Sequence, residues 1–220
     1  MRGALITCSV IVAATVLAAG QPVPTVRFGI DNRQCRAAAV KGEWERELRE
    51  RLPEFVALWN TVGPRMVTAV STLTGRPFSP AGSVSLTLCD VPSNSFFGTT
   101  VNMRFALRSF TPSPVPLRYK VDTAFHEMLH EFVGRHVPGT SPLLRAHASA
   151  SRCVANHLHL LALQKAVLLA GGDGAALDVV IATDSALPSS CYKTAWGIVN
   201  ASPTAYESFV RELSTSGAPR

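Results

Sequence analysis

The chain has 220 residues, of which 47% are hydrophobic and 16% are charged, and its formal net charge is +6. This length and hydrophobic content are sufficient for one domain with a core and exclude a chain that is disordered throughout. The basic residues are scattered among acidic ones, without a basic stripe or regularly spaced aromatic residues, so we expect no nucleic-acid partner.

The first twenty residues have the pattern of a secretory signal peptide. Arg2 precedes an apolar run from residue 4 to residue 19, and the small residues at positions 18–20 lie at its end. The run is shorter than the ~20 residues that span a bilayer, and small residues favour cleavage. We therefore expect a signal peptide over residues 1–20 and a secreted or periplasmic domain over residues 21–220, without a later membrane span. An uncleaved membrane anchor is the alternative.

Four cysteines remain after the signal peptide: Cys35, Cys89, Cys153 and Cys191. In an oxidising compartment this number predicts two disulfides, for which three pairings exist. We favour Cys153 with Cys191, because both lie in a half of the sequence that has helical patterns. The sequence contains no CxxC motif, so a zinc site built from thiolates is not expected.

The N-terminal third predicts one strand followed by helices. Residues 25–30 alternate and are β-branched, which is typical of a strand. An apolar residue at every fourth position predicts a helix over residues 35–51. Pro53 is expected to begin a second helix, and Gly63-Pro64 to separate it from a short third helix that ends at Gly75.

Strands are predicted in the middle of the sequence. Residues 83–89 alternate strictly, a turn follows, and residues 98–107 alternate again, which predicts an antiparallel pair. A proline-rich segment then leads to a helix over residues 117–133, for which Gly134 is a suitable C-terminal cap.

The remaining residues are expected to be helical. Ser141-Pro142 is a typical start for a long helix that continues to about residue 170. Shorter helices are predicted over residues 175–183, 190–199 and 203–213. The predicted fold class is therefore α+β, with a small antiparallel sheet ahead of a mainly helical C-terminal half.

A short motif on the helix of residues 117–133 carries the chemistry. His126, Glu127 and His130 form the pattern HExxH. On an α-helix, residues four apart lie about 40° from each other, so both imidazoles reach the same metal ion. Two neutral imidazoles leave a zinc ion Lewis-acidic, and the glutamate is placed to act as a base for a water on the metal.

The uncharged residues before and within this motif complete a pattern that resembles the zincin metallopeptidases. Glu131 departs from it, because that position is usually uncharged in the family. The resemblance implies a Zn²⁺ cofactor and a sheet ahead of the motif helix, whose edge strand, here residues 98–107, binds an extended peptide. It also implies a third zinc ligand in the helical part that follows.

The third ligand is not obvious from the residues. The glutamate of one large zincin group has no counterpart, since no glutamate occurs between Glu131 and Glu207. His136 completes the metzincin spacing HExxHxxxxxH, but Val133 stands where metzincins have glycine, and no methionine follows Met128 for their Met-turn.

Two further histidines lie in the apolar run that follows. His157 and His159 each require a polar partner if buried, and that partner is either a metal or a carbonyl or carboxylate of the protein. We predict His157 as the third ligand, because zincins commonly present this ligand from the next helix, and retain His136 as the alternative.

These residues together predict a peptidase that acts on peptides or proteins, and we expect it to be a monomer. Glu127 would accept a proton from a water activated by zinc and pass it to the leaving amine. The resemblance also implies a donor to the oxyanion, for which four residues are candidates. They are Arg135, His159, Tyr192 and Tyr206.

Two other interpretations remain open. The irregular third ligand is also compatible with a zincin-like envelope protein that binds metal and a partner without turnover. Alternatively, the protein is a disulfide-stabilised helical protein with a chance HExxH motif. Metal analysis separates the last interpretation from the other two.

Overall fold

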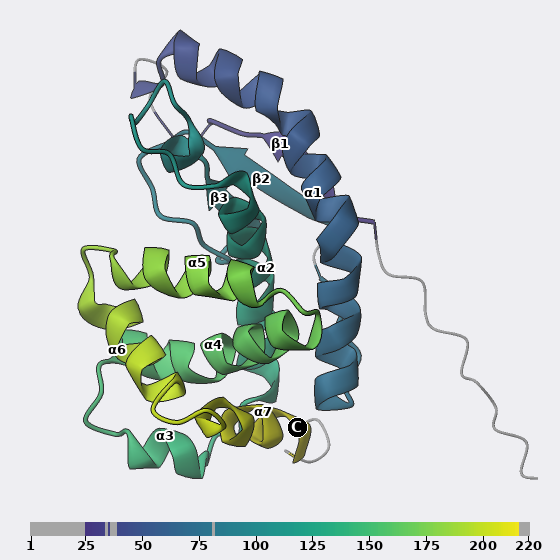
Figure 1. Cartoon of the computed structure of the whole chain (residues 1–220), viewed down its shortest axis with the longest axis vertical. Helices are drawn as coiled ribbons and strands as arrows, with labels where there is room; N and C mark the ends of the chain where they lie inside the picture. Colours follow the sequence, from purple (N-terminus) through teal and green to yellow (C-terminus); the bar gives the residue numbers. More distant parts are fainter. Residues whose placement is uncertain (1–24, 34, 36–38, 81, 216–220) are drawn as a thin grey trace, which may run out of the picture.

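The structure is a computed structural model that describes residues 25–33, 35, 39–80 and 82–215. The predicted signal peptide therefore lies outside the described residues. The described part of the protein is α+β, as predicted, and mainly helical (Figure 1). Its elements are β1 (Arg27–Ile30), α1 (Gly42–Thr74), β2 (Ser83–Thr87), β3 (Thr99–Asn102), η2 (Arg104–Ala106), α2 (Leu117–His136), α3 (Pro142–Ala146), α4 (Arg152–Ala170), α5 (Gly174–Ser185), α6 (Ser190–Val199) and α7 (Ala205–Thr215).

The three strands form a parallel sheet in the order β1-β2-β3, so the predicted antiparallel pair is wrong. Residues 88–98 return the backbone to the start of β2, and Thr99 therefore pairs beside Val84. The predicted strand over residues 98–107 is also too long. After β3 the backbone turns into the 3₁₀ helix η2, and Phe105 in this helix is 56% exposed.

Helix α1 is continuous through Pro53 and Pro64, so both predicted breaks are wrong. Each proline removes one backbone donor, but the helix buries an apolar stripe along its length against the core, and this burial offsets that cost. Gly63 has a specific packing role, because a Cβ there would lie 2.5 Å from the Trp59 ring. Gly75 ends the helix in the left-handed conformation at φ 66°, as predicted.

Helix α2 is longer than predicted, because Gly134 stays helical and the helix continues to His136, just before Pro138. The long helix predicted after Ser141 is two helices, α3 and α4. Ser141 accepts a hydrogen bond from the Leu144 amide, and Ser151 accepts one from the Val154 amide. Ser151 therefore caps the start of a new helix, α4, which was not predicted from the sequence.

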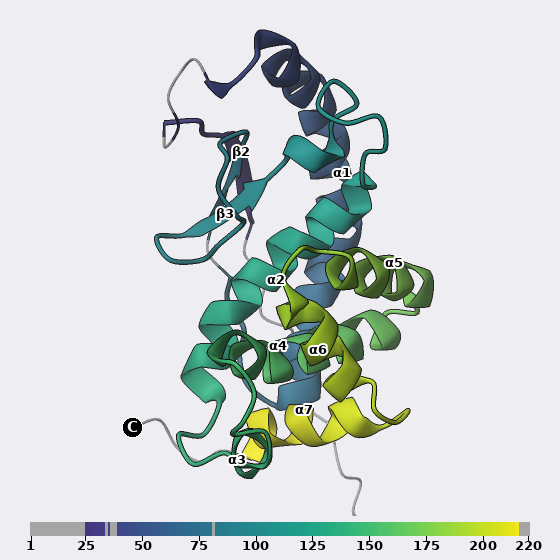
Figure 2. The same cartoon turned by 90° about the vertical axis from the view of Figure 1, so that its left-hand side faces the viewer.

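The helices are arranged around α2 and α4. Figures 1 and 2 show α1 along one side of the molecule, with α2 passing from the sheet into the helical half. Helix α4 contacts α1, α2, α5, α6 and α7 and forms the centre of that half. Among the described helices, α4 alone is long and apolar enough to cross a membrane, but 72% of its apolar 18-residue stretch is buried inside the protein, which is typical of a core helix.

Two disulfides join distant parts of the sequence, as predicted. One links Cys35 to Cys89, and the other links Cys153 to Cys191, the pair that the sequence favoured. Disulfides persist in oxidising compartments, so both bonds are compatible with a protein outside the cytoplasm.

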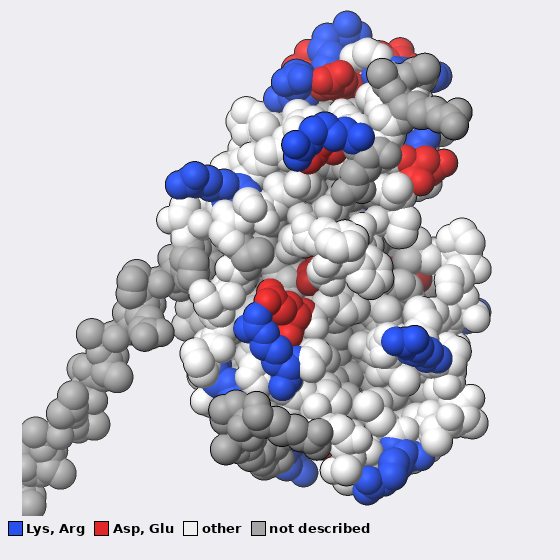
Figure 3. Space-filling view, turned by 180° about the vertical axis from the view of Figure 1, so that it is seen from behind, with Lys and Arg blue, Asp and Glu red and all other residues white. Residues whose placement is uncertain are grey.

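Charged side chains of both signs are interspersed at the end of the molecule where α1 begins, on the face seen in Figure 3. The rest of that face is mostly uncharged, with separate basic groups, one of which lies beside an acidic group. No broad surface of one sign covers the described part of this face, in agreement with the charge pattern of the sequence.

Candidate metal centre

Helix α2 carries the HExxH motif in the interior of the molecule. It packs against β3, α1, α4 and α5, and both His126 and Glu127 are only 5% exposed. His126 and His130 lie one turn apart, and their ring centroids are 5.0 Å apart. The helical spacing therefore places both imidazoles on the side of α2 that faces α4.

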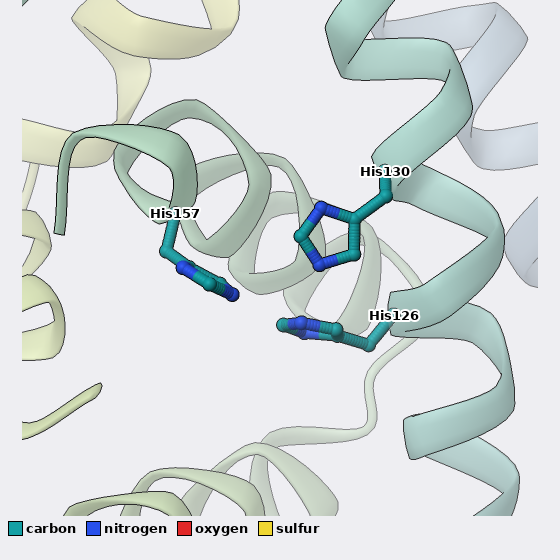
Figure 4. Close-up of side chains that lie close together, drawn as sticks. All are labelled: His126, His130 and His157. Carbon is teal, nitrogen blue, oxygen red and sulfur yellow. The ribbon is translucent and has the colours of Figure 1, made fainter. Parts of the chain in front are cut away.

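Helix α4 places His157 opposite this pair. Figure 4 shows the three imidazoles pointing toward a common point between α2 and α4. One nitrogen from each of the three rings lies within 4.8 Å of the others. The structure thus brings together the two histidines of the motif and the histidine that we predicted as the third ligand.

Two of the rings have a defined tautomer. The Nδ1 atom of His126 donates to Oε1 of Gln164 at 3.0 Å, and Nδ1 of His157 donates to the carbonyl of Cys153 at 2.7 Å. Because both acceptors are oxygen atoms, the proton is on Nδ1 and the lone pair of each ring is on Nε2. Such hydrogen bonds orient histidines that bind metals.

Burial keeps the three imidazoles neutral. It lowers the pKa of His126 well below its usual value and that of His130 to about 4, and it also lowers the pKa of His157. The neighbouring rings lower the pKa values of His126 and His130 further. Neutral imidazoles at neutral pH are the form that binds a metal ion.

Glu127 and Tyr192 complete the surroundings of the three rings. Oε2 of Glu127 lies 3.9 Å from Nε2 of His130, and burial raises the pKa of Glu127 to about 8. The Tyr192 hydroxyl lies 3.5 Å from Nε2 of His126. Burial, with the nearby Glu127 carboxyl, raises the pKa of Tyr192, so its hydroxyl stays protonated and is able to donate.

A cavity of about 230 Å³ opens beside these groups. Its lining includes His126, Glu127 and Tyr192, together with groups from α2, α4, α5 and η2 that the sequence did not single out. The additional residues that matter for its chemistry are Phe105, Tyr119, Lys120, Gln164 and Asp184.

The other candidates lie away from the three rings. His136 is not among the three converging histidines, and its Nδ1 contacts the Phe132 carbonyl at 2.7 Å. The Nε2 atom of His159 contacts Glu212 at 2.9 Å, so that histidine has the carboxylate partner of a core residue. Arg135 pairs with Glu131 on the surface of α2.

Tyr206 also lies elsewhere, with Lys165 over its ring. Of the four candidate oxyanion donors, only Tyr192 lies beside the converging histidines.

Gln164, the hydrogen-bond partner of His126, was not predicted from the sequence. Its position, two turns after His157 on the same apolar helix, was the available signal.

The edge of the sheet differs from the expectation for peptide binding. β3 is an edge strand, but Thr100 already exchanges backbone hydrogen bonds with Asn94 at 2.9 and 3.0 Å. The amide of Asn102 donates to Ser93 Oγ at 3.0 Å. These bonds occupy backbone groups that a peptide would need in order to add a strand there.

The donor set fits a zinc ion. Three neutral imidazoles, two with fixed tautomers, are a known ligand set for catalytic zinc, and they leave one position for water or substrate. No protein-family model, curated protein or solved structure matched this sequence. The geometry of the site therefore carries the functional argument by itself.

Proposed function

We propose that the protein is a zinc-dependent peptidase of the zincin type that acts outside the cytoplasm. His126, His130 and His157 would hold the Zn²⁺. The observation that carries this proposal is the approach of the three ring nitrogens to within 4.8 Å of one another, beside a buried glutamate. The two disulfides support the location.

Zn²⁺ would supply Lewis-acid chemistry, which polarises a carbonyl and lowers the pKa of water. Glu127 lines the cavity and lies 3.9 Å from His130, so it is placed to take a proton from the attacking water. It then passes this proton to the amine that leaves when the peptide bond breaks. A nearby divalent cation favours the ionised carboxylate and offsets the effect of burial on its pKa.

Tyr192 is the residue best placed to stabilise the developing negative charge. Its hydroxyl is protonated and lies on the side of His126 that carries the free lone pair. A donor aimed at the oxyanion stabilises the transition state more than the substrate. Gln164 and the Cys153 carbonyl hold the imidazoles in their ligand tautomers.

The first test measures bound metal. Purified mature protein should contain about one zinc ion per molecule by elemental analysis, as expected for a single catalytic site. His157→Gln should lose most of this zinc. The matched control is His136→Gln, which also removes a histidine but lies outside the converging three and should retain it. Equal zinc in both variants would exclude His157 as a ligand.

The second test measures hydrolysis with a library of quenched fluorescent peptides. Glu127→Gln should retain zinc and lose at least about 10²-fold in rate, since it removes the general base. Glu131→Gln, at an exposed position one turn further along the same helix, should cleave like the wild type. Cleavage by Glu127→Gln at the wild-type rate would contradict the mechanism. Zinc binding without any cleavage by the wild type would favour a binding protein.

A further inference from the structure

The cavity lined by His126, Glu127 and Tyr192 is also lined by a buried lysine that the proposed hydrolysis does not use. Lys120 lies on α2 and is only 7% exposed. It lines the same cavity as His126 and Glu127. A buried ammonium group normally requires an anionic or polar partner, because desolvation disfavours its charge.

The protein places an aromatic ring and a carboxylate near Lys120, but neither forms a hydrogen bond with its ammonium group. The ammonium group of Lys120 lies 5.5 Å from the centre of the Tyr119 ring, and the Asp184 carboxylate is near enough to favour its charge. Among the described residues, however, neither a hydrogen bond nor an ion pair is formed by the Lys120 ammonium. Its donors are therefore available to a molecule in the cavity.

Among the described residues, Asp184 forms neither a hydrogen bond nor an ion pair with Lys120, and each of its oxygens accepts a bond from another side chain. Oδ1 accepts a hydrogen bond from the Tyr119 hydroxyl at 2.8 Å, and Oδ2 accepts one from Nε1 of Trp196 at 3.0 Å. These bonds hold the carboxylate in place at a distance from the lysine. Asp184 thus favours the charged form of Lys120 without occupying its hydrogen-bond donors.

The charges around the cavity point to an anionic ligand. Burial lowers the pKa of Lys120 to about 8, so its amine is still mostly protonated at neutral pH, whereas His126 is neutral. The proposed Zn²⁺ would add positive charge on the side of His126. A carboxylate on the substrate would supply the anionic partner that the Lys120 ammonium lacks among the described residues.

We propose that Lys120 forms a subsite for a carboxylate of the substrate, next to the scissile bond. This inference rests on the proposed peptidase function. His126 lies six positions after Lys120, which is about 9 Å along α2. Because an extended peptide covers about 3.3–3.6 Å per residue, the carboxylate lies within about three residues of the bond that is cleaved.

The carboxylate has two sources, the C-terminus of a peptide or an Asp or Glu side chain. The size of the cavity, about 230 Å³, is below the ~300–1,000 Å³ of pockets for drug-sized ligands, so it takes one end of a peptide or one side chain. Apolar groups such as Phe105 and Leu187 form other parts of its lining and suit an apolar residue beside the charge.

The test compares matched substrates with the zinc-loaded protein. The first pair is an N-acetylated peptide with a free C-terminal carboxylate and the same peptide as its amide. The second pair consists of amidated peptides with Glu or Gln at each of three positions on either side of the cleaved bond. We expect the carboxylate form of at least one pair to have the higher kcat/KM, and the pair identifies the source.

Lys120→Met removes the charge and retains much of the apolar volume. It should lower kcat/KM about 10- to 100-fold for the carboxylate substrate, the usual effect of a lost hydrogen bond to a charged group, and about 2-fold or less for its neutral counterpart. Lys165→Met is the control. Lys165 is another mostly buried lysine, but it is bonded to Asn200 and lies outside the lining of this cavity. It should affect both substrates equally.

A binding measurement separates this inference from the peptidase function. Calorimetry with N-acetylphenylalanine and its amide measures recognition of the carboxylate without turnover. Carboxylate preference that disappears in Lys120→Met supports the subsite even if the wild type cleaves no peptide. If the wild type cleaves peptides, but acid and amide forms bind and react alike and Lys120→Met changes neither, the subsite is wrong while the peptidase function stands.

Discussion

The Nδ1 atom of His126 on α2 donates a hydrogen bond of 3.0 Å to Oε1 of Gln164, a buried residue of α4. This bond joins the motif helix to the helix that carries His157. It also leaves the Nε2 lone pair of His126 free, and the three imidazoles point toward a common point. A single buried amide therefore links the packing of the helical half to the chemistry of the site.

Substitution of Gln164 should weaken metal binding. Gln164→Met has a similar volume but accepts no hydrogen bond from His126, so we expect zinc affinity to fall about 10- to 100-fold, as for other partners of metal-bound histidines. Competition with a chelating dye measures this affinity. Gln164→Glu retains an acceptor and should restore tight binding. Equal affinities in Gln164→Met and the wild type would show that the bond does not orient the ligand.

The Cys153–Cys191 disulfide should matter for metal binding as well as for stability. The Cys153 carbonyl orients His157, and Cys191 immediately precedes Tyr192. Replacement of both cysteines by serine should lower the free energy of unfolding by about 2–4 kcal/mol and also weaken zinc binding about 10-fold or more. Denaturant unfolding and zinc titration measure the two effects.

The Cys35–Cys89 bond provides the control for this experiment. It lies in the part of the molecule that contains the sheet, away from the three histidines. Its removal should reduce stability by a similar amount, about 2–4 kcal/mol, without changing zinc affinity. Loss of zinc affinity in both double variants would mean that general destabilisation is the cause.

Tyr192→Phe should reduce kcat much more than it changes KM. The substitution removes a hydroxyl that lies 3.5 Å from His126 Nε2 and retains the aromatic ring. Loss of an oxyanion donor typically costs about 10²–10³-fold in kcat, while zinc content should stay that of the wild type. Tyr206→Phe removes a hydroxyl outside the site and serves as the control. An unchanged kcat in Tyr192→Phe would remove this residue from the mechanism.

The stability of the metal-free protein should depend on pH through Asp122. Burial raises the pKa of Asp122 to about 7 from its usual 3.8, against the opposing effect of Arg118 at 3.2 Å. The folded state thus holds a proton that the unfolded state releases between these two values. The contribution of Asp122 to the free energy of unfolding is therefore fully present below pH 3.8 and is lost as the pH rises through about 7.

Asp122→Asn does not titrate and should remove this dependence. Between about pH 4 and pH 8, the unfolding free energy of the variant should rise relative to the wild type, by an amount of the order of 4 kcal/mol. Urea unfolding with a chelator present measures it, and Asp178→Asn, an exposed aspartate on α5, is the control. A difference between Asp122→Asn and the wild type that stays constant with pH would contradict a raised pKa.

Local patterns in the sequence were sufficient for several features of the structure. The spacing of His126 and His130 depends only on helical geometry. The Ser141 side chain caps the start of α3, and Gly75 ends α1 in the left-handed conformation, as expected for these residue types. The α+β class followed from the periods of the hydrophobic residues. These features depend on residues a few positions apart, so the amino-acid order alone specified them.

Tertiary structure decided what depends on distant residues. The direction of the strands followed from the path of residues 88–98, which local alternation does not encode. Pro53 and Pro64 stay inside α1, since burial of the helix outweighs two lost hydrogen bonds. Likewise, the sequence offered His136 and His157 as third ligands. Only the packing of α4 against α2 brought His157 to the motif, because the approach of two helices depends on side chains throughout the core.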